Sequence, residues 1–244
     1  MSTESTPLRL FAILALALSL AVTPPSAAQS EDTMAKTGPI FSGQGAQPGE
    51  AMPDVVLTRI DGSEVRLSEL WGDRPTVLVT GSLTCPTARS RHPGVEEVAA
   101  AFGDGINVAY IYTVEAHPET DPSPYGKLWA EHRRSLGMEV PEGEAGEVWE
   151  APINVTEGFS RRQPTDFATR QGLAAEFDDR LEAQVPILID GMDNAAWEAM
   201  GGGPNMGVLV REGGVVEVKH GWFDGPSMKG SIEWLLERAA RGED

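Results

Sequence analysis

The chain contains a single cysteine, Cys85, and its place in the sequence is the strongest chemical signal in the chain. It follows the apolar run 76–81 and directly precedes Pro86, a residue favoured in the first turn of a helix. A helix start offers unpaired N–H groups and a positive dipole end, which stabilise a thiolate. We therefore expect a nucleophilic thiol whose pKa is lowered further by Arg89 and Arg91. The alternative is a buried, inert cysteine.

The absence of a second cysteine limits the redox chemistry that this thiol can perform. Ala88 occupies the position at which a two-cysteine redox motif carries its second thiol. Oxidised Cys85 would therefore be a sulfenic acid, a mixed disulfide or a sulfenyl halide, which a thiol from outside must resolve. We expect no cofactor other than that external thiol reductant. We also expect no metal, because His132 and His220 have no ligands at metal-binding spacing.

The elements around Cys85 predict an α/β fold. Buried strands are expected at 76–81, 106–112 and 185–190, and helical patterns follow the first two of them. The remaining elements are a hairpin at 55–67, a hairpin at 207–219 and a C-terminal amphipathic helix with Ser227 as its cap. A β-α-β unit followed by an antiparallel hairpin and a final helix is the thioredoxin-like plan, a central mixed sheet flanked by helices.

The first residues have the pattern of a secretory signal peptide over 1–28. Arg9 precedes an apolar stretch of thirteen residues, 10–22, which is short for a membrane span, and the small residues 26–28 suit cleavage before Gln29. An uncleaved membrane anchor is the alternative. We expect a secreted or periplasmic protein without stable membrane insertion after cleavage.

The mature chain is expected to be one domain over 49–244, preceded by a polar, flexible leader at 29–48. The segment 118–150 does not fit the thioredoxin-like plan, since it is rich in proline and carries eight acidic against three basic residues. We expect it to be an insertion after the second core strand that caps or flanks the site. The alternative is a solvated loop without function.

The charge balance excludes one class of partner. Lys and Arg total 19 against 37 Asp and Glu, a net charge of −18, so a nucleic-acid-binding surface is not expected. The expected partners are a small-molecule or disulfide substrate and a thiol reductant. The sequence leaves the physiological substrate and the oligomeric state, including a homodimer, open.

Three motifs resemble those of the iodothyronine deiodinases. The segment Gly81–Pro86 (GSLTCP) resembles their active-site segment, in which selenocysteine stands at the position of Cys85. The segment Tyr112–Pro118 (YTVEAHP) resembles their Tyr-Ile-x-Glu-Ala-His segment, and Met192-Asp193-Asn194 their Met-Asp-Asn. The resemblance covers about 50–240 apart from the insertion, and the N-terminal part also resembles the wider redoxin group.

The resemblance implies that Cys85 is the nucleophile of a reductive dehalogenation. Ser82, Thr84, Tyr112 and His117 would form a hydrogen-bond relay that supplies protons, with Glu115 beside them. The reaction requires a soft nucleophile to take iodine as I⁺ and an acid to protonate the ring carbon. A histidine with an ordinary pKa near ~6.5 suits that acid role at neutral pH.

Three further residues are expected to contact the substrate: Arg89, Asn194 and Pro204. Pro204 stands just before a predicted strand, where thioredoxins carry a cis-proline facing the thiol, and we leave open whether its peptide bond is cis. The chain has Cys in place of selenocysteine, which makes a weaker nucleophile. The family's second active-site histidine has no counterpart here, since Gly158 or its neighbours stand at that position, and Met206 aligns with the arginine thought to bind the hormone carboxylate. These last two departures argue against a thyroid hormone as the natural substrate.

Two other functions stay open. The first is a one-cysteine peroxidase or a thiol-disulfide oxidoreductase, for which Ser82 could serve as the peroxidatic threonine, although Leu78 stands where peroxiredoxins carry proline. The second is a non-catalytic exported binding module on a redoxin scaffold, in which the acidic insertion 118–150 would be the partner surface.

Overall fold

The computed structural model describes residue 38 and residues 40–72, 74–135, 137, 139–140 and 148–243. The predicted signal peptide, 1–28, and the leader up to residue 37 lie outside the described residues. Within the described part, no helix is long and apolar enough to cross a membrane.

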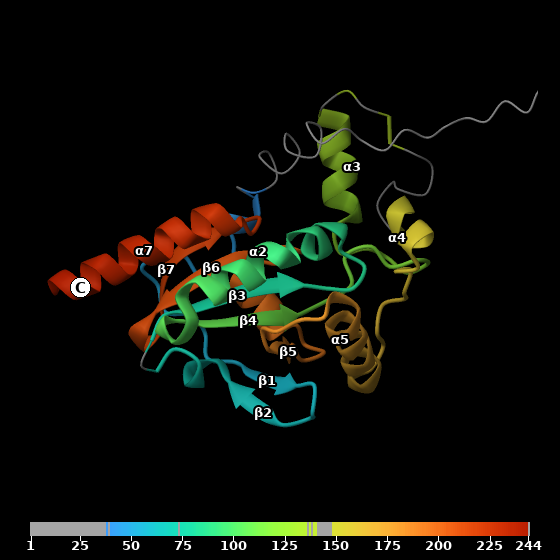
Figure 1. Cartoon of the computed structure of the whole chain (residues 1–244). Coiled ribbons are helices and arrows are strands. Elements are labelled where there is room, and N and C mark those ends of the chain that lie inside the picture. Colours follow the sequence, from blue (N-terminus) through green and yellow to red (C-terminus); the bar gives the residue numbers. More distant parts are fainter. Residues whose placement is uncertain are drawn as a thin grey trace, which may run out of the picture.

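One mixed sheet of seven strands forms the centre of the protein (Figure 1), in the order β2-β1-β5-β4-β3-β6-β7. β3, β4 and β5 are parallel, whereas β1 and β6 run antiparallel to β5 and β3 on either side. The strands are β1 (Val56–Arg59), β2 (Glu64–Arg66), β3 (Thr76–Gly81), β4 (Asn107–Tyr112), β5 (Ile187–Ile189), β6 (Gly207–Arg211) and β7 (Val215–His220).

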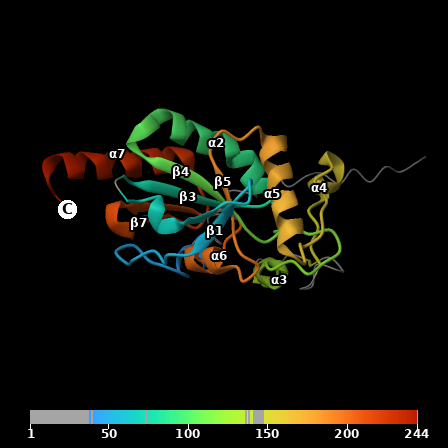
Figure 2. The ribbon, with the colours of Figure 1, turned by 90° about the horizontal axis from the view of Figure 1, so that it is seen from below.

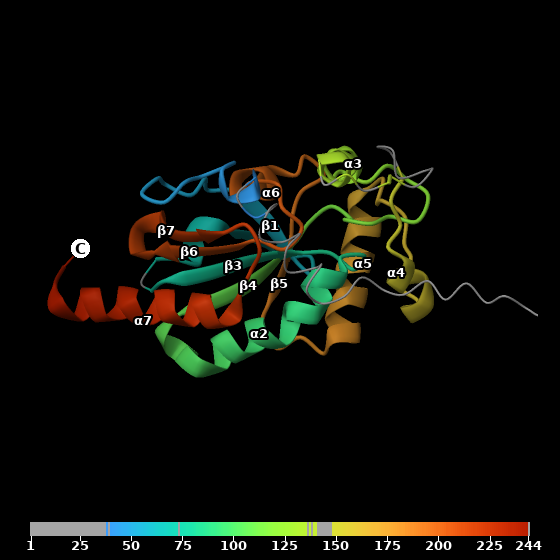
Figure 3. The same ribbon diagram turned by 90° about the horizontal axis from the view of Figure 1, so that it is seen from above.

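Helices cover both faces of this sheet, and two more lie beyond the end of the sheet where β3 finishes (Figure 1 and Figure 2). They are α2 (Pro86–Phe102), α3 (Gly126–Ser135), α4 (Pro152–Glu157), α5 (Phe167–Leu181), α6 (Ala195–Met200) and α7 (Gly225–Arg241). α2, α5 and α7 bury apolar side chains such as Val95, Phe177 and Ile232 against one face, and α6 packs Met200 against the other (Figure 3). Short 3-10 turns lie at Leu67–Glu69, Gly103–Gly105 and Glu212–Gly214.

The predicted α/β fold is confirmed, and most of its elements lie where the pattern indicates. β3 and β6 have the expected bounds, and Asp166 caps α5 by accepting the Thr169 N–H at 2.8 Å. The cap of α7 differs from the prediction: Asp224, not Ser227, is the N-cap, and its carboxylate accepts the N–H of Ser227 at 3.0 Å.

Two regions differ from the expectation at the end of the sheet where β3 finishes. The insertion contains α3, and α4 follows it; neither helix has a long apolar stripe, so periodicity did not reveal them (Figure 2). Residues 40–48 of the expected flexible leader instead pack on the domain. This packing buries Phe41, which is only 3% exposed. The Ala46 N–H also bonds to Ala199 O at 2.9 Å, and Lys219 donates to Gln44 O.

Two glycines should respond in opposite directions to alanine. A Cβ at Gly207 on β6 would lie 2.8 Å from the Phe223 ring and 3.2 Å from Met228, so Gly207→Ala overpacks the core beneath α7. We expect a loss of about 1–3 kcal/mol in the free energy of unfolding. Gly230→Ala, in open space on α7, should instead stabilise by up to about 1 kcal/mol. Urea unfolding measures both, and equal effects would contradict this packing.

Candidate active site

Cys85 is the N-cap residue of α2 and lies just beyond the end of the buried strand β3, as the sequence predicts. Its sulfur accepts the N–H of Ala88 at 3.4 Å, so one of the unpaired amides at the helix start is directed at the thiol. The register pairs Gly81 of β3 with Tyr112 of β4, which brings the segments 82–85 and 113–117 to one edge of the sheet.

Burial changes the expected ionisation of this thiol. Cys85 is 1% exposed, and burial raises the pKa of its thiol from 9.0 to about 11. The N–H of Ala88 and the charge of Arg89 lower that pKa, as the sequence predicts, but their effect is smaller than that of desolvation. The prediction that the pKa of the Cys85 thiol is lowered is therefore wrong for this structure, in which the buried sulfur is protonated at neutral pH.

Aromatic side chains pack in the same apolar cluster as the thiol, and together they are called the aromatic shell. We use this name for the aromatic members of the apolar cluster that contains Cys85: Phe41, Tyr125, Trp149, Trp197 and Trp222. Phe41 meets Tyr125 and Trp222 edge to face, with ring centroids 5.8 and 5.6 Å apart.

Two segments outside the core plan contribute to this shell. Phe41 comes from the N-terminal segment, and Tyr125 and Trp149 come from the insertion. The expectation that the insertion caps the site therefore agrees with this arrangement.

Glu115 is the hub of the predicted relay. Its carboxylate accepts the N–H and the hydroxyl of Thr84 at 2.9 and 2.7 Å, and Tyr112 donates its hydroxyl to it. Burial raises the pKa of Glu115, although these hydrogen bonds lower it. Tyr112 also accepts the Leu83 N–H at 3.1 Å, and Ser82 accepts the Ala116 N–H at 3.2 Å. In the described part of the chain, these bonds join Thr84, Tyr112 and Glu115 to one another, whereas the Ser82 hydroxyl bonds to the backbone of Ala116, and none of them ends on the sulfur.

His117 lies in the same group, but with a different ionisation from the one expected. Its backbone N–H bonds to the Thr84 hydroxyl at 3.0 Å, and its Nδ1 lies 3.2 Å from the carbonyl of Trp149, to which it can only donate. Burial lowers the pKa of His117 from 6.5 to about 4. The prediction that His117 acts as the acid is therefore wrong at neutral pH, because its ring is neutral there and its Nε2 can accept a proton.

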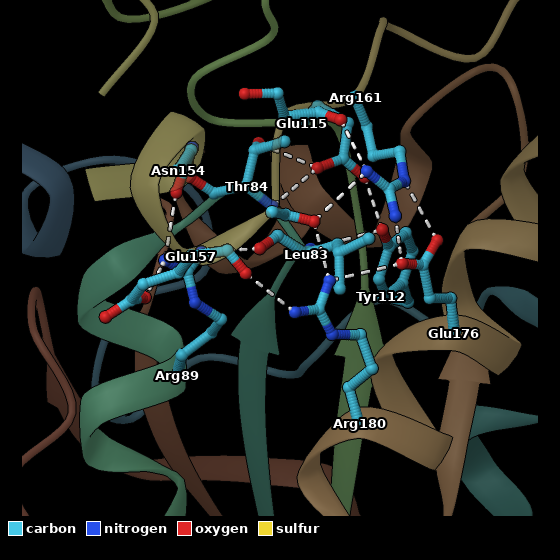
Figure 4. Close-up of polar contacts among 12 residues, drawn as sticks. Leu83, Thr84, Arg89, Tyr112, Glu115, Asn154, Glu157, Arg161, Glu176 and Arg180 are labelled. Atoms are coloured by element: carbon cyan, nitrogen blue, oxygen red, sulfur yellow. Dashed lines mark hydrogen bonds and ion pairs between the residues drawn. The ribbon is translucent and has the colours of Figure 1, made fainter. Parts of the chain in front are cut away.

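Arg89 is buried beside the Cys85 loop and occupied by protein groups. It donates to Leu83 O at 2.6 Å and to Asn154 Oδ1 at 2.9 Å (Figure 4). Asn154 donates to Thr84 O at 2.8 Å and is fully buried. In the sequence, the one pattern that includes Asn154 is a match to a glycosylation sequon, Asn154-Val155-Thr156. The amide of Asn154 is buried and hydrogen-bonded, so it is not accessible for glycosylation.

The other two residues expected at the substrate have structural partners. Asn194 precedes α6 in a left-handed conformation and accepts Arg170 Nη2 at 2.9 Å. Pro204 is buried, and no cis peptide bond occurs among the described residues, so the bond before Pro204 is trans. Its neighbour Met206 contributes to the apolar cluster around Cys85, with its N–H on Thr80 Oγ1 at 2.8 Å.

Among the described residues, the side chains that could bind a metal do not cluster. No group of three or more His, Cys, Asp or Glu residues in the described ranges is arranged to hold a metal ion. The charged groups near Cys85 instead pair with one another or with backbone atoms.

Comparison with known proteins gives the fold a second line of support. No protein-family profile and no curated protein matches the sequence. A hypothetical protein of Sinorhizobium meliloti 1021 is 14% identical over 80% of this chain and 86% of its own, with a TM-score of 0.51. A candidate protein disulfide isomerase of Bacteroides thetaiotaomicron is 14% identical over 82% of this chain and 96% of its own, with a TM-score of 0.50.

A candidate thiol:disulfide interchange protein, DsbE, of Chlorobium tepidum matches at 16% identity over 80% of this chain and 98% of its own, with a TM-score of 0.48. At such identities the similarity concerns the fold alone. The architecture of this chain is thioredoxin-like: a central mixed sheet with helices on both faces.

The buried His117 makes stability depend on pH. Because its folded pKa of about 4 lies below the unfolded value of 6.5, its contribution is full above pH 6.5 and is lost as the pH falls toward 4. We expect the loss in unfolding free energy over this window to be smaller in His117→Gln than in the wild type, by up to about 3 kcal/mol. Urea unfolding between pH 4 and 7 measures it, and parallel curves would contradict the assignment.

Removing one ring of the aromatic shell should expose the thiol. Phe41→Ala opens the shell, which weakens the burial that raises the pKa of Cys85, so alkylation by iodoacetamide at pH 8 should be about tenfold faster. Ile40→Ala is the matched control, since Ile40 is 38% exposed. Equal alkylation of wild type and Phe41→Ala would show that Phe41 does not protect the thiol.

Proposed function

We propose that the chain is an exported thiol-dependent oxidoreductase in which Cys85 is the nucleophile and an external thiol restores it. The observation that supports this most is the position of Cys85 at the N-cap of α2, with its sulfur on the Ala88 N–H and the relay of Thr84, Tyr112 and Glu115 beside it. Two of the solved structures that resemble this chain are named as a thiol:disulfide interchange protein and a protein disulfide isomerase. These names describe those two proteins, and they agree with the redox function proposed for this chain.

The finer proposal is reductive dehalogenation of a small aromatic molecule, as the sequence motifs imply. The Cys85 thiolate takes I⁺ from the ring, so an S–I bond forms, the C–I bond breaks and the ring carbon gains a proton. A first external thiol displaces iodide and leaves a mixed disulfide on Cys85. A second external thiol releases the Cys85 thiolate and forms the external disulfide, which balances the electrons.

The relay contains groups that can donate the proton that the ring carbon gains. Glu115, whose pKa is raised by burial, can share a proton with the hydroxyl of Tyr112, to which it is hydrogen-bonded. His117 is neutral at pH 7 and would accept rather than donate a proton. We propose that the Glu115–Tyr112 pair delivers the proton and that His117 is a positioning residue through its backbone bond to Thr84.

The aromatic shell supports a small, flat substrate. Because Cys85 is buried, the disulfide of a folded protein cannot reach the sulfur without opening the shell. A small aromatic molecule can replace one ring contact of the shell with its own. Opening also removes part of the desolvation that keeps the thiol protonated, so binding and activation of the nucleophile would be coupled.

The test is turnover by the reduced mature chain with excess dithiothreitol and one of three substrates: an iodophenol, an aromatic disulfide or hydrogen peroxide. We expect iodide release from the iodophenol, and a decrease of more than about a hundredfold in Cys85→Ser.

The other outcomes contradict parts of the proposal. Fast sulfenic acid formation with peroxide and no iodide release would contradict dehalogenation and favour a peroxidase. Turnover of the disulfide alone would leave a thiol-disulfide oxidoreductase. No turnover of any substrate by a folded chain would contradict the proposed function and favour a binding module.

A further inference from the structure

Two backbone carbonyls just before Cys85 are held by a polar clamp. We define the clamp as Arg89, Asn154 and Glu157. Arg89 Nη1 donates to Leu83 O at 2.6 Å, and Asn154 Nδ2 donates to Thr84 O at 2.8 Å. Since Asn154 Oδ1 also accepts Arg89 Nη2 at 2.9 Å, the three bonds fix the loop and the guanidinium relative to each other (Figure 4).

Glu157 places a negative charge on the outer side of this clamp. Its carboxylate lies 3.3 Å from Arg89 Nη2, and its side chain is 46% exposed against 7% for Arg89. A buried cation therefore lies between the thiol loop and a counter-charge at the rim. The positive charge favours the thiolate, and Glu157 offsets part of that charge.

The Arg89 guanidinium is fixed from a further side. It lies 3.9 Å from the centroid of Phe159, and the guanidinium of Arg180 lies 3.5 Å from the same ring. Arg180 also donates to the backbone carbonyls of Glu157 and Gly158, at 2.9 and 2.7 Å. The α4 end that carries Asn154 and Glu157 is thus anchored to α5, and Arg89 has little freedom to leave the thiol loop.

We propose that Asn154 and Glu157 are positioning residues that hold Arg89 against the Cys85 loop and set how much of its charge acts on the sulfur. The proposal deepens the proposed function, since it takes Cys85 as the nucleophile. Neither residue touches the sulfur in this arrangement, and their effect passes through Arg89 and the carbonyls of Leu83 and Thr84.

Other charged or titratable groups also face this site and must stay unchanged in the test. Those that interact electrostatically with the Cys85 thiol or Arg89 are Arg91 on α2, Tyr110 on β4, Glu115, His117, Tyr125 and Arg180. None is altered in the variants below, so a shift in the pH profile reports on the clamp.

Two variants of the clamp should move the thiol in opposite directions. Glu157→Gln keeps a hydrogen-bond acceptor for Arg89 but removes the charge that offsets it, so the thiol pKa should fall. Asn154→Asp adds a negative charge at the Arg89 contact and removes the donor to Thr84 O, so the thiol pKa should rise. We expect a shift of about half a unit each way, or roughly a threefold change in alkylation rate below the pKa.

The measurement is the rate of Cys85 alkylation by iodoacetamide against pH, using the full mature chain. Val155→Ala, at a 63% exposed neighbour, and Glu64→Gln, at an exposed position on β2, are the controls and should match the wild type. A purely structural role would move neither profile or would move both in the same direction.

Opposite shifts with these signs support the clamp. Unchanged profiles, shifts in one common direction, or the reversed signs would overturn it. If Asn154→Asp fails to fold, the rim variant Glu157→Gln decides alone, and an unchanged or raised pKa in it overturns the proposal. Alkylation does not require turnover, so opposite shifts in a chain without turnover would keep the clamp and contradict only the proposed function.

Discussion

The chemistry of this protein depends on two opposing influences on one sulfur atom. The start of α2 and the charge of Arg89 favour the Cys85 thiolate, whereas burial beneath the aromatic shell favours the neutral thiol and prevails. The fold provides both influences. A parallel strand that leads directly into a helix creates the first, and the aromatic shell, to which two segments outside the thioredoxin-like core contribute, creates the second. A thiol in this balance is protected until its surroundings change.

The same logic explains the polar groups around the sulfur. Glu115 is fully buried, which is costly for a carboxyl group, and the backbone and hydroxyl of Thr84 together with Tyr112 satisfy it. A network in which every member is bonded fixes the loops 82–85 and 113–117 against each other. The acid that could supply a proton is therefore also the group that holds the nucleophile loop in place.

The sequence predicted the framework well because buried strands and helix starts are local signals. The run 76–81 and the junction at Cys85-Pro86 each depend on neighbouring residues, and the structure has them where expected. Tyr112, Glu115 and Thr84 were found through motifs, and the register of β3 with β4 brings them together.

The properties that the sequence could not predict arise from contacts distant in the chain. Burial raises the pKa of Cys85 and lowers that of His117. The apolar cluster that contains Cys85 includes Phe41 from the N-terminal segment and Tyr125 from the insertion, and the Trp149 ring meets that of His117 edge to face. Asn154 lies 70 residues from the carbonyl that it holds, on a helix of six residues without apolar periodicity. No spacing rule relates such positions, so the closed, protonated state of the thiol becomes visible only in three dimensions.

The central claim is that Cys85 is a nucleophile protected by its shell and not an inert buried cysteine. The most direct measurement compares the rate at which a small aromatic disulfide forms a mixed disulfide on Cys85 in the folded Phe41→Ala variant and in the same variant unfolded in urea, at pH 7.5, followed by mass spectrometry. The account predicts a faster reaction in the folded variant, because opening the shell removes part of the burial while the Ala88 N–H and the charge of Arg89 still favour the thiolate. A folded variant that reacts more slowly than its unfolded chain would contradict it.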